Sequence, residues 1–244
     1  MSKINPEWYK AWFDSEYYHI LYQHRNQTEA HAFVKKLFEY LDLPDNSKVL
    51  DLACGRGRHA QFIAHLGYDV LGIDLSENNI KSAQAHAHNH LKFKVHDMTI
   101  PLQADFDAVL NLFTSFGYFE STQQNFNTLK AIKQNLKPNG VGVIDFLNEA
   151  YLRQHLIPKS TVEKNNLTFH IKRWIEDSFV YKEIKFTDKS QDFCFYERVK
   201  LITKNEFEQF FKQHDLKITA KFGNYNLDGF DISNSERLIL VYQA

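Results

Sequence analysis

The sequence of 244 residues is short of cysteine and of net charge, and each shortage excludes a class of protein. Two cysteines, Cys54 and Cys194, are too few for a disulfide framework, so nothing requires an oxidising compartment. The 29 basic and 30 acidic side chains nearly cancel, which disfavours nucleic acid as the main partner. No apolar run approaches the roughly 20 residues of a membrane helix, and the first residues lack the apolar segment of a secretory signal. We therefore expect a soluble, cytoplasmic protein that does not bind membranes.

Hydrophobic residues make up 43% of the chain, enough for a packed core. From residue 7 to residue 43 they recur at the helical period, which predicts a pair of helices with Asp14 or Ser15 between them. Pro44-Asp45-Asn46 ends this pattern. Residues 1–43 are therefore expected to form an N-terminal helical segment.

Short apolar strands then alternate with helices, which predicts a parallel sheet with helices on both faces. The expected strands are 48–53, 68–74, 91–95, 106–113 and 141–146, and the expected helices are 58–66, 77–88 and 123–136. The pattern returns near the end with a helix at 204–214 and strands at 217–222 and 237–242. The α/β core is therefore expected to comprise residues 44–150 and 203–244.

Residues 151–202 differ in character from the core. Three segments rich in β-branched and aromatic residues, at 168–175, 179–186 and 193–201, are separated by turn-like residues. They predict an antiparallel β-sheet inserted into the α/β fold. Whether this insertion forms a wall of the substrate site or a dimer surface is left open by the sequence.

Gly55 and Gly57 stand between the first expected strand and the first expected helix. Glycine allows a tight turn and close approach of a ligand, and a helix start offers unpaired N–H groups. Asp74 ends the next strand, 19 residues after Gly55, close to the ~20 typical of an acid that binds ribose hydroxyls. Either feature alone also occurs in ordinary turns and caps, but together they predict a nucleoside-containing ligand.

Three features favour a cationic nucleoside over a dinucleotide. Asp51 places a carboxylate beside the glycine loop, where it would repel a pyrophosphate and attract an amino or sulfonium group. Asp97 ends the third strand and can accept from an adenine amino group, while Met98 can pack on the ring. The chain is also too short for a nicotinamide-binding fold with a full substrate domain.

These segments match, in order and spacing, the motifs of class I S-adenosylmethionine-dependent methyltransferases, which the chain resembles over residues 48–146. They are Val49-Leu-Asp-Leu-Ala-Cys-Gly-Arg-Gly57, Gly72-Ile-Asp-Leu75, His96-Asp-Met98, residues 107–112 and Leu136-Lys-Pro-Asn-Gly140. The resemblance implies a Rossmann-like α/β fold, a seven-stranded sheet whose last strand is antiparallel, and S-adenosylmethionine as cofactor.

The resemblance also implies a role for each matching residue. Ala53, Gly55 and Gly57 would line the methionine moiety, Asp74 would hold the ribose, Asp97 and the Met98 backbone would hold adenine, Leu75 would flank it, and Leu112 would offer its backbone near the methionine amino group. Asp51 is added to these candidate cofactor-binding residues because its negative charge would attract an amino or sulfonium group.

The segment Leu21 to Ala30 is similar to the one that precedes the core in glycine N-methyltransferase and related small-molecule enzymes. There a tyrosine and an arginine reach the methionine carboxylate. On this chain the resemblance assigns that role to Tyr22 and Arg25, with Tyr18 one turn earlier, in a lid over the cofactor. An arginine fork suits a carboxylate, although a solvated helix face is the alternative.

No catalytic group or metal ligand is identified. Phe116 and Tyr118 follow the fourth strand and, with Tyr225, are candidates for the acceptor pocket, with packing in the core as the alternative for Phe116. Tyr118 and Tyr225 are also candidates for a base, and His59 less so. The alternate histidines of 86–90 do not share one helix face, so we expect no metal site there.

The sequence thus predicts methyl transfer to N or O of a small-molecule acceptor. Two alternatives remain: an RNA-modifying methyltransferase, which the neutral charge disfavours, and a non-catalytic protein that binds S-adenosylmethionine. A homodimer is neither required nor excluded.

Overall fold

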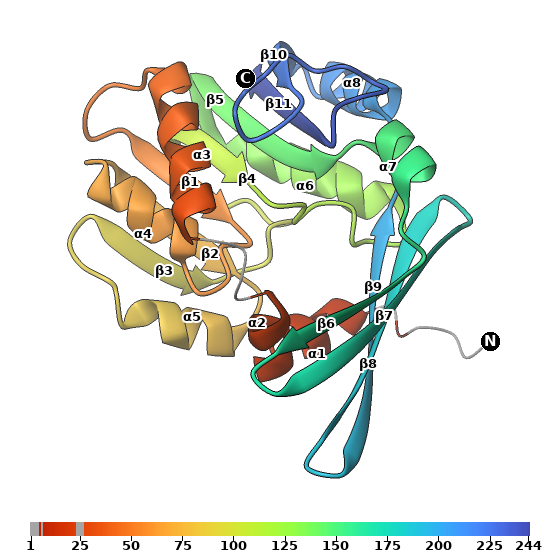
Figure 1. Ribbon diagram of the computed structural model, residues 1–244. Coiled ribbons are helices and arrows are strands. Elements are labelled where there is room, and N and C mark those ends of the chain that lie inside the picture. Colours follow the sequence, from red (N-terminus) through yellow and green to blue (C-terminus); the bar gives the residue numbers. More distant parts are fainter. Residues whose placement is uncertain (1–4, 6, 23–26) are drawn as a thin grey trace.

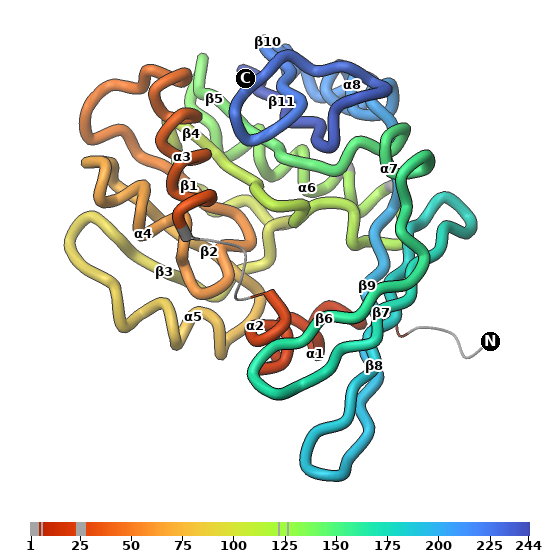
Figure 2. Tube along the Cα trace, in the orientation of Figure 1, coloured from red at the N-terminus to blue at the C-terminus, as the bar shows by residue number. Residues whose placement is uncertain are grey.

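The computed structural model describes residues 5, 7–22 and 27–244. A central sheet is covered by helices on both faces, and a smaller sheet projects from one side (Figure 1). Figure 2 shows that the first two helices lie beside the small sheet, which is distant from them in sequence. No helix in these described ranges is long and apolar enough to cross a membrane.

The central sheet has seven strands in the order β10-β11-β5-β4-β1-β2-β3. Their bounds are β1 Lys48–Leu52, β2 Asp69–Asp74, β3 Leu91–Val95, β4 Phe106–Asn111, β5 Leu136–Leu147, β10 Lys217–Phe222 and β11 Arg237–Gln243. Strand β11 is antiparallel to both of its neighbours, and the other pairs are parallel. The expected Rossmann-like sheet with an antiparallel last strand is confirmed.

Two apolar cores lie on the two faces of this sheet. Helices α3 (Gln27–Leu41), α4 (Arg58–His65) and α5 (Glu77–Gln84) cover one face, and α6 (Thr122–Asn135) and α8 (Lys204–Gln213) cover the other. Successive residues of β1 alternate between them, so Val49 belongs to the first core and Leu50 to the second. Because both faces are covered, the central strands are apolar almost throughout.

The small sheet is antiparallel, in the order β6-β7-β8-β9. Its strands are β6 Lys159–Lys164, β7 Leu167–Glu176, β8 Phe179–Asp188 and β9 Gln191–Lys200. One face packs against helices α1 (Trp8–Phe13) and α2 (Glu16–Tyr22) through a third apolar cluster, which includes Trp12, Leu21, Phe169 and Ile184. The inserted sheet expected from the sequence is therefore present and supports the N-terminal helices.

Several elements differ from expectation. Strand β6 carries one apolar residue, Val162, so its sequence gave no strand signal. Helix α7 (Glu149–His155) has no fully buried side chain and was likewise not expected. In its described residues the N-terminal segment has three helices where a pair was expected. Helix α5 ends at Gln84 because residues 85–88 turn back toward β3.

Candidate functional site

A cavity of about 1270 Å³ lies at the carboxyl ends of the parallel strands. Asp51, Asp74, Asp97, Leu112 and Leu147 line it from within or just beyond β1 to β5. Its other walls come from α1, α2, α7 and the inserted sheet. Ligands of open α/β folds bind at this edge of the sheet, so the topology predicts a binding site here.

The loop after β1 is held in a left-handed conformation. Ala53, Gly55 and Gly57 have φ angles of 54°, 58° and 78°. Ala53 and Gly55 line the cavity. Gly57 is buried instead, and a Cβ added there would lie 2.5 Å from the Phe93 ring. Gly57 therefore permits close packing of α4 against β3, which is a different role from the expected contact with a ligand.

The acids at the ends of β2 and β3 are fixed by backbone contacts. Asp74 accepts hydrogen bonds from the N–H groups of Gly55 and Ser76, both at 2.9 Å. Burial raises the pKa of Asp74, and these two bonds oppose the shift. Asp97 accepts from the backbone and the hydroxyl of Thr99, both at 2.8 Å. Both carboxyl groups are thus held in place at the cavity wall.

Asp51 lines the cavity although it is only 1% exposed. Its Oδ2 atom is buried and has no hydrogen-bond partner within the described ranges. Burial, and then repulsion from Asp74, raise the pKa of Asp51 to about 7. A buried carboxylate oxygen without a donor is costly, so this position fits a ligand that brings a cationic donor.

The turn after β4 carries two consecutive left-handed residues. Phe113 and Thr114 have φ angles of 56° and 61°, a conformation that costs non-glycine residues roughly 1–2 kcal/mol each. Asp145 of β5 holds the turn, since its carboxylate accepts from the Phe113 N–H at 2.8 Å and its backbone oxygen accepts from the Thr114 N–H at 3.0 Å. The turn thereby fixes the position of Leu112, which lines the cavity.

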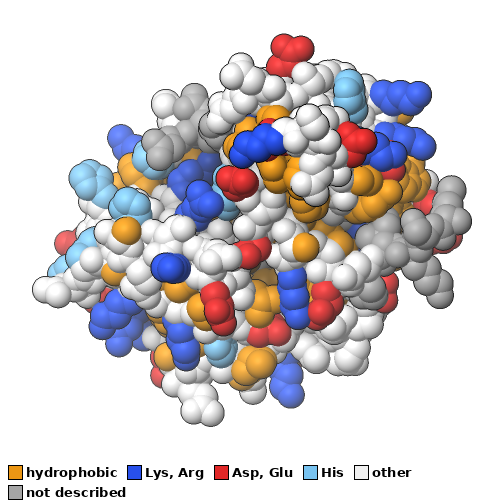
Figure 3. All heavy atoms as spheres, turned by 90° about the horizontal axis from the view of Figure 1, so that it is seen from below, with side chains coloured by type: hydrophobic (Ala, Val, Ile, Leu, Met, Phe, Trp, Pro, Cys, Tyr) orange, Lys and Arg blue, Asp and Glu red, His pale blue; other side chains and the backbone are white. Residues whose placement is uncertain are grey.

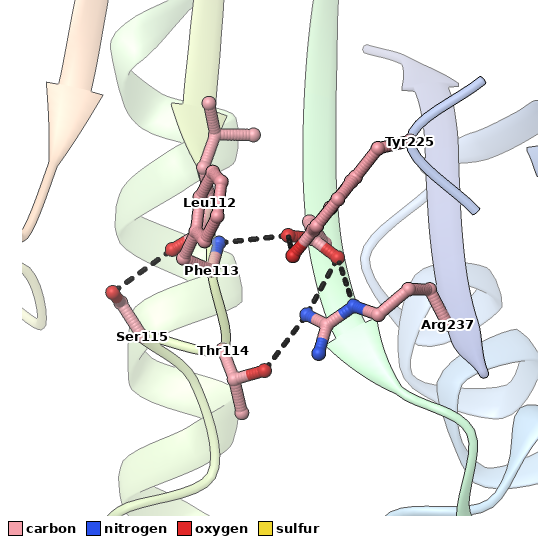
Figure 4. Close-up of polar contacts among 7 residues, drawn as sticks. Leu112, Phe113, Thr114, Ser115, Tyr225 and Arg237 are labelled. Carbon is pink, nitrogen blue, oxygen red and sulfur yellow. Dashed lines mark hydrogen bonds and ion pairs between the residues drawn. The ribbon is translucent and has the colours of Figure 1, made fainter. Parts of the chain in front are cut away.

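Asp145 is fully buried and belongs to a wider network (Figure 4). Arg237 donates to its Oδ1 through Nε at 2.8 Å and Nη2 at 2.6 Å. Arg237 also donates to the Thr114 hydroxyl at 2.8 Å, and the Tyr225 hydroxyl donates to Asp145 Oδ2 at 3.2 Å. Strands β4, β5 and β11 are thus joined beneath the cavity.

Asp145→Asn is expected to lower the free energy of unfolding by about 3–5 kcal/mol, because it leaves the Arg237 guanidinium without its buried partner. Urea denaturation measures this change. The matched control is Asp107→Asn, which affects an ion pair with Lys137 near the amino end of β4, where Asp107 is 29% exposed. The control should cost about 1 kcal/mol or less. Equal losses would mean that the Asp145 network is no stronger than a surface pair.

Helices α1 and α2 bridge the core and the inserted sheet. Asp14 accepts from the Ser76 hydroxyl at 2.5 Å and from the Asn78 amide at 2.6 Å, at the start of α5. On the other side, the Trp12 indole and the Tyr22 hydroxyl donate to Glu197 of β9, at 2.8 Å and 2.6 Å. These contacts close the cavity between the two sheets.

The structure brings most of the expected site residues together. The expected residues that line the cavity are Tyr18, Tyr22, Asp51, Ala53, Gly55, Asp74, Leu75, Asp97, Met98, Leu112, Tyr118 and Tyr225. Phe116 is fully buried and packs against Phe146 and Phe207, so it lies in the core. The expected role of Arg25 falls outside the described residues.

Sequence reasoning left open whether the inserted sheet forms a wall of the site, and it missed the charged residues that the sheet contributes. Arg173, Lys182 and Glu197 line the cavity from β7, β8 and β9. Each lies two residues along its strand from an apolar residue of the third cluster and so shares its face of the sheet, but the sequence alone does not say what that face meets. Burial lowers the pKa of His59 to about 3, and the ring stacks on Phe113.

Comparison with known proteins identifies residues 49–140 as a methyltransferase domain. A dTDP-3-amino-3,4,6-trideoxy-alpha-D-glucopyranose N,N-dimethyltransferase of Streptomyces venezuelae is 28% identical over 42% of this chain and 43% of its own length. A ubiquinone biosynthesis O-methyltransferase of Roseobacter denitrificans is 34% identical over 52% of this chain and 49% of its own. The chain matches about half the length of these curated relatives.

The fold extends the likeness across the chain. An S-adenosylmethionine-dependent methyltransferase from Clostridium acetobutylicum superposes with a TM-score of 0.78 at 17% identity, covering 93% of this chain and 95% of that one. The sheet order and the domain match agree with this likeness. Residues 49–140 thus form a methyltransferase domain, and the fold of the chain is that of S-adenosylmethionine-dependent methyltransferases, whose cofactor is S-adenosylmethionine.

Proposed function

We propose that the protein transfers a methyl group to a nitrogen or oxygen atom of a small-molecule acceptor. The observation that carries the proposal is the buried Asp51 oxygen, which has no partner within the described chain and lies in the wall of the cavity. A cationic amino group would supply the missing donor, whereas a pyrophosphate would be repelled. When bound, S-adenosylmethionine supplies an electrophilic methyl carbon on a sulfonium.

The proposed contacts follow the positions of the side chains around the cavity. The residues that would hold the cofactor are Asp51 at the amino group, Ala53, Gly55 and the Leu112 backbone along the methionine part, Asp74 at the ribose, Asp97, Met98 and Leu75 at the adenine, and Tyr18 and Tyr22 in the lid. Because Asp74 is already bonded to Gly55 and Ser76, the ribose subsite is organised before the ligand arrives.

The acceptor would occupy the half of the cavity that faces the inserted sheet. Leu147, Leu152, Leu156, Val180 and Val199 line it there. These apolar side chains exclude water, and the walls restrict the orientation of the acceptor. Such positioning can contribute about 7–11 kcal/mol in favourable systems, so a displacement of this kind needs no dedicated metal or covalent intermediate.

A small acceptor is favoured over RNA by charge. Acidic and basic side chains are interspersed on the face seen in Figure 3, rather than gathered as a basic stripe. Relatives that methylate an aminosugar derivative or act in ubiquinone biosynthesis are consistent with either nitrogen or oxygen as the methylated atom. Cytoplasmic location, a dimeric state and the absence of nucleic-acid binding stay predictions.

The proposal is tested by incubating the purified protein with methyl-labelled S-adenosylmethionine and three acceptor sets: primary and secondary amines, phenols, and total RNA. We expect label in a member of the amine or phenol set. Transfer to RNA alone would support the RNA-modifying alternative. Cofactor binding without transfer to any set would support the non-catalytic alternative.

Asp14→Ala is expected to weaken binding of S-adenosylhomocysteine about tenfold. Asp14 ties helices α1 and α2 to α5 through two hydrogen bonds, and hydrogen bonds to a carboxylate contribute about 1.5–3 kcal/mol. The change should fall mainly on the dissociation rate, measured by stopped-flow fluorescence. Asp45→Ala, at an exposed site outside the cavity, serves as the control. An unchanged dissociation rate would show that α1 and α2 do not retain the ligand.

A further inference from the structure

Three charged residues form one row across the inserted sheet. Arg173 of β7 is directly opposite Lys182 of β8, and Lys182 is directly opposite Glu197 of β9. All three residues line the cavity. The row therefore brings two cations and one anion to the half of the cavity proposed for the acceptor.

Lys182 and Glu197 form an ion pair with each other, and together they contact the N-terminal helices α1 and α2. The Lys182 ammonium lies 3.5 Å from Glu197 Oε2 and also contacts the Tyr22 hydroxyl. Glu197 Oε1 accepts from both Trp12 and Tyr22. Their side chains are 14% and 17% exposed, so this is a largely buried pair. The negative charge of Glu197 thus lies beside Lys182.

Arg173 is held differently. Its Nη1 donates to the Ser160 hydroxyl at 2.9 Å and approaches the Ile157 carbonyl at 3.4 Å. These neutral acceptors orient the guanidinium without balancing its charge. In the part of the chain that the structure describes, no carboxylate lies within ion-pair distance of Arg173. The Nε and Nη2 atoms of the Arg173 guanidinium make no hydrogen bond to the described residues.

Like charges placed directly opposite each other on neighbouring strands destabilise a sheet. The Arg173–Lys182 pair is of this kind; Glu197 forms an ion pair with Lys182, and within the described residues it forms none with Arg173. An anionic ligand at Arg173 would offset the second charge. A guanidinium fork binds both oxygens of a carboxylate or phosphate at once, so this position matches planar or tetrahedral oxyanions.

We propose that Arg173 is the subsite for an anionic group of the methyl acceptor, a carboxylate or a phosphate. The inference rests on the proposed function, since it assigns the substrate class of the same cavity. Val180 of β8 and Val199 of β9 lie directly opposite each other, two residues along their strands from Lys182 and Glu197, and both line the cavity. The expected acceptor therefore combines an anionic group with an apolar body.

The test uses calorimetry on the whole protein, first with S-adenosylhomocysteine alone and then, at saturation with it, with three probes. The probes are benzoate, phenyl phosphate and the neutral analogue benzamide. Arg173→Gln removes the charge, and Lys172→Gln is the matched control, because Lys172 is the neighbouring exposed cation on β7 and does not line the cavity. Thermal unfolding and S-adenosylhomocysteine affinity of both variants report on folding.

We expect benzoate or phenyl phosphate to bind more tightly than benzamide, and Arg173→Gln to weaken that binding about 10- to 100-fold. Lys172→Gln should leave it unchanged. The anion that binds more tightly shows whether the subsite takes a carboxylate or a phosphate. Anions that bind no better than benzamide, or equal losses in the two variants, would overturn the proposal. Failure to bind S-adenosylhomocysteine would instead contradict the proposed function.

Discussion

Asp74→Ala is expected to weaken binding of S-adenosylmethionine by about a hundredfold or more. Two hydrogen bonds from ribose hydroxyls to a carboxylate contribute about 1.5–3 kcal/mol each. The substitution also releases the N–H groups of Gly55 and Ser76, which Asp74 holds at 2.9 Å. The ribose subsite and the glycine loop are therefore lost together. Calorimetric titration of the variant measures the effect.

Asp69→Ala is the matched control, because Asp69 lies at the opposite end of the same strand, β2, where it pairs with His90 at 2.5 Å. Its side chain is 41% exposed, and we expect wild-type affinity. The assignment of Asp74 to the ribose would be wrong if the two variants bound the cofactor equally well.

Asp51→Asn is expected to affect binding and stability in opposite directions. Removing the charge partner of a buried cation costs roughly 2–5 kcal/mol, so affinity should fall about thirtyfold or more. In the ligand-free protein, however, the pKa of Asp51 is raised from its ordinary 3.8 to about 7, mainly by burial. Folding therefore opposes ionisation of Asp51, and this cost grows as pH rises from about 4 to 7 and is fully present above 7. Asparagine avoids it.

Two measurements check this prediction. Urea denaturation at pH 8 should show the ligand-free Asp51→Asn protein to be more stable than wild type. Calorimetry from pH 6 to pH 8 should show wild-type affinity for S-adenosylmethionine rising with pH as Asp51, with its pKa of about 7, ionises. The variant should lack that part of the dependence. A variant that loses stability, or that binds as wild type does, contradicts a cation site at Asp51.

The core of the fold follows from local patterns in the sequence. The bounds of β3 and β10 agree with those expected, since each is a short strand between clear turn signals. The glycine loop joins β1 to α4 and Asp74 ends β2, as expected, because their spacing reflects one strand–turn–helix unit. Class I methyltransferase motifs then supplied the antiparallel last strand, which periodicity alone does not give.

The remaining parts depend on tertiary contacts that sequence does not reveal. Gly57 and Phe116 have residue types that suit a ligand site, yet one permits packing against Phe93 and the other fills a core. Conversely, Arg173 and Asp145 are ordinary charged residues in the sequence. The fold shows that Arg173 of the inserted sheet lines the cavity, and that the pairing of β11 with β5 brings Arg237 to Asp145.

The central claim is that the cavity binds S-adenosylmethionine through a carboxylate that accepts a cation. The most direct measurement is calorimetric titration of the purified wild-type protein with S-adenosylmethionine and S-adenosylhomocysteine, with NAD as the control. We expect binding of the first two in the micromolar range and none of NAD, whose pyrophosphate would lie against Asp51. Binding of NAD, or of none of the three, would contradict the account.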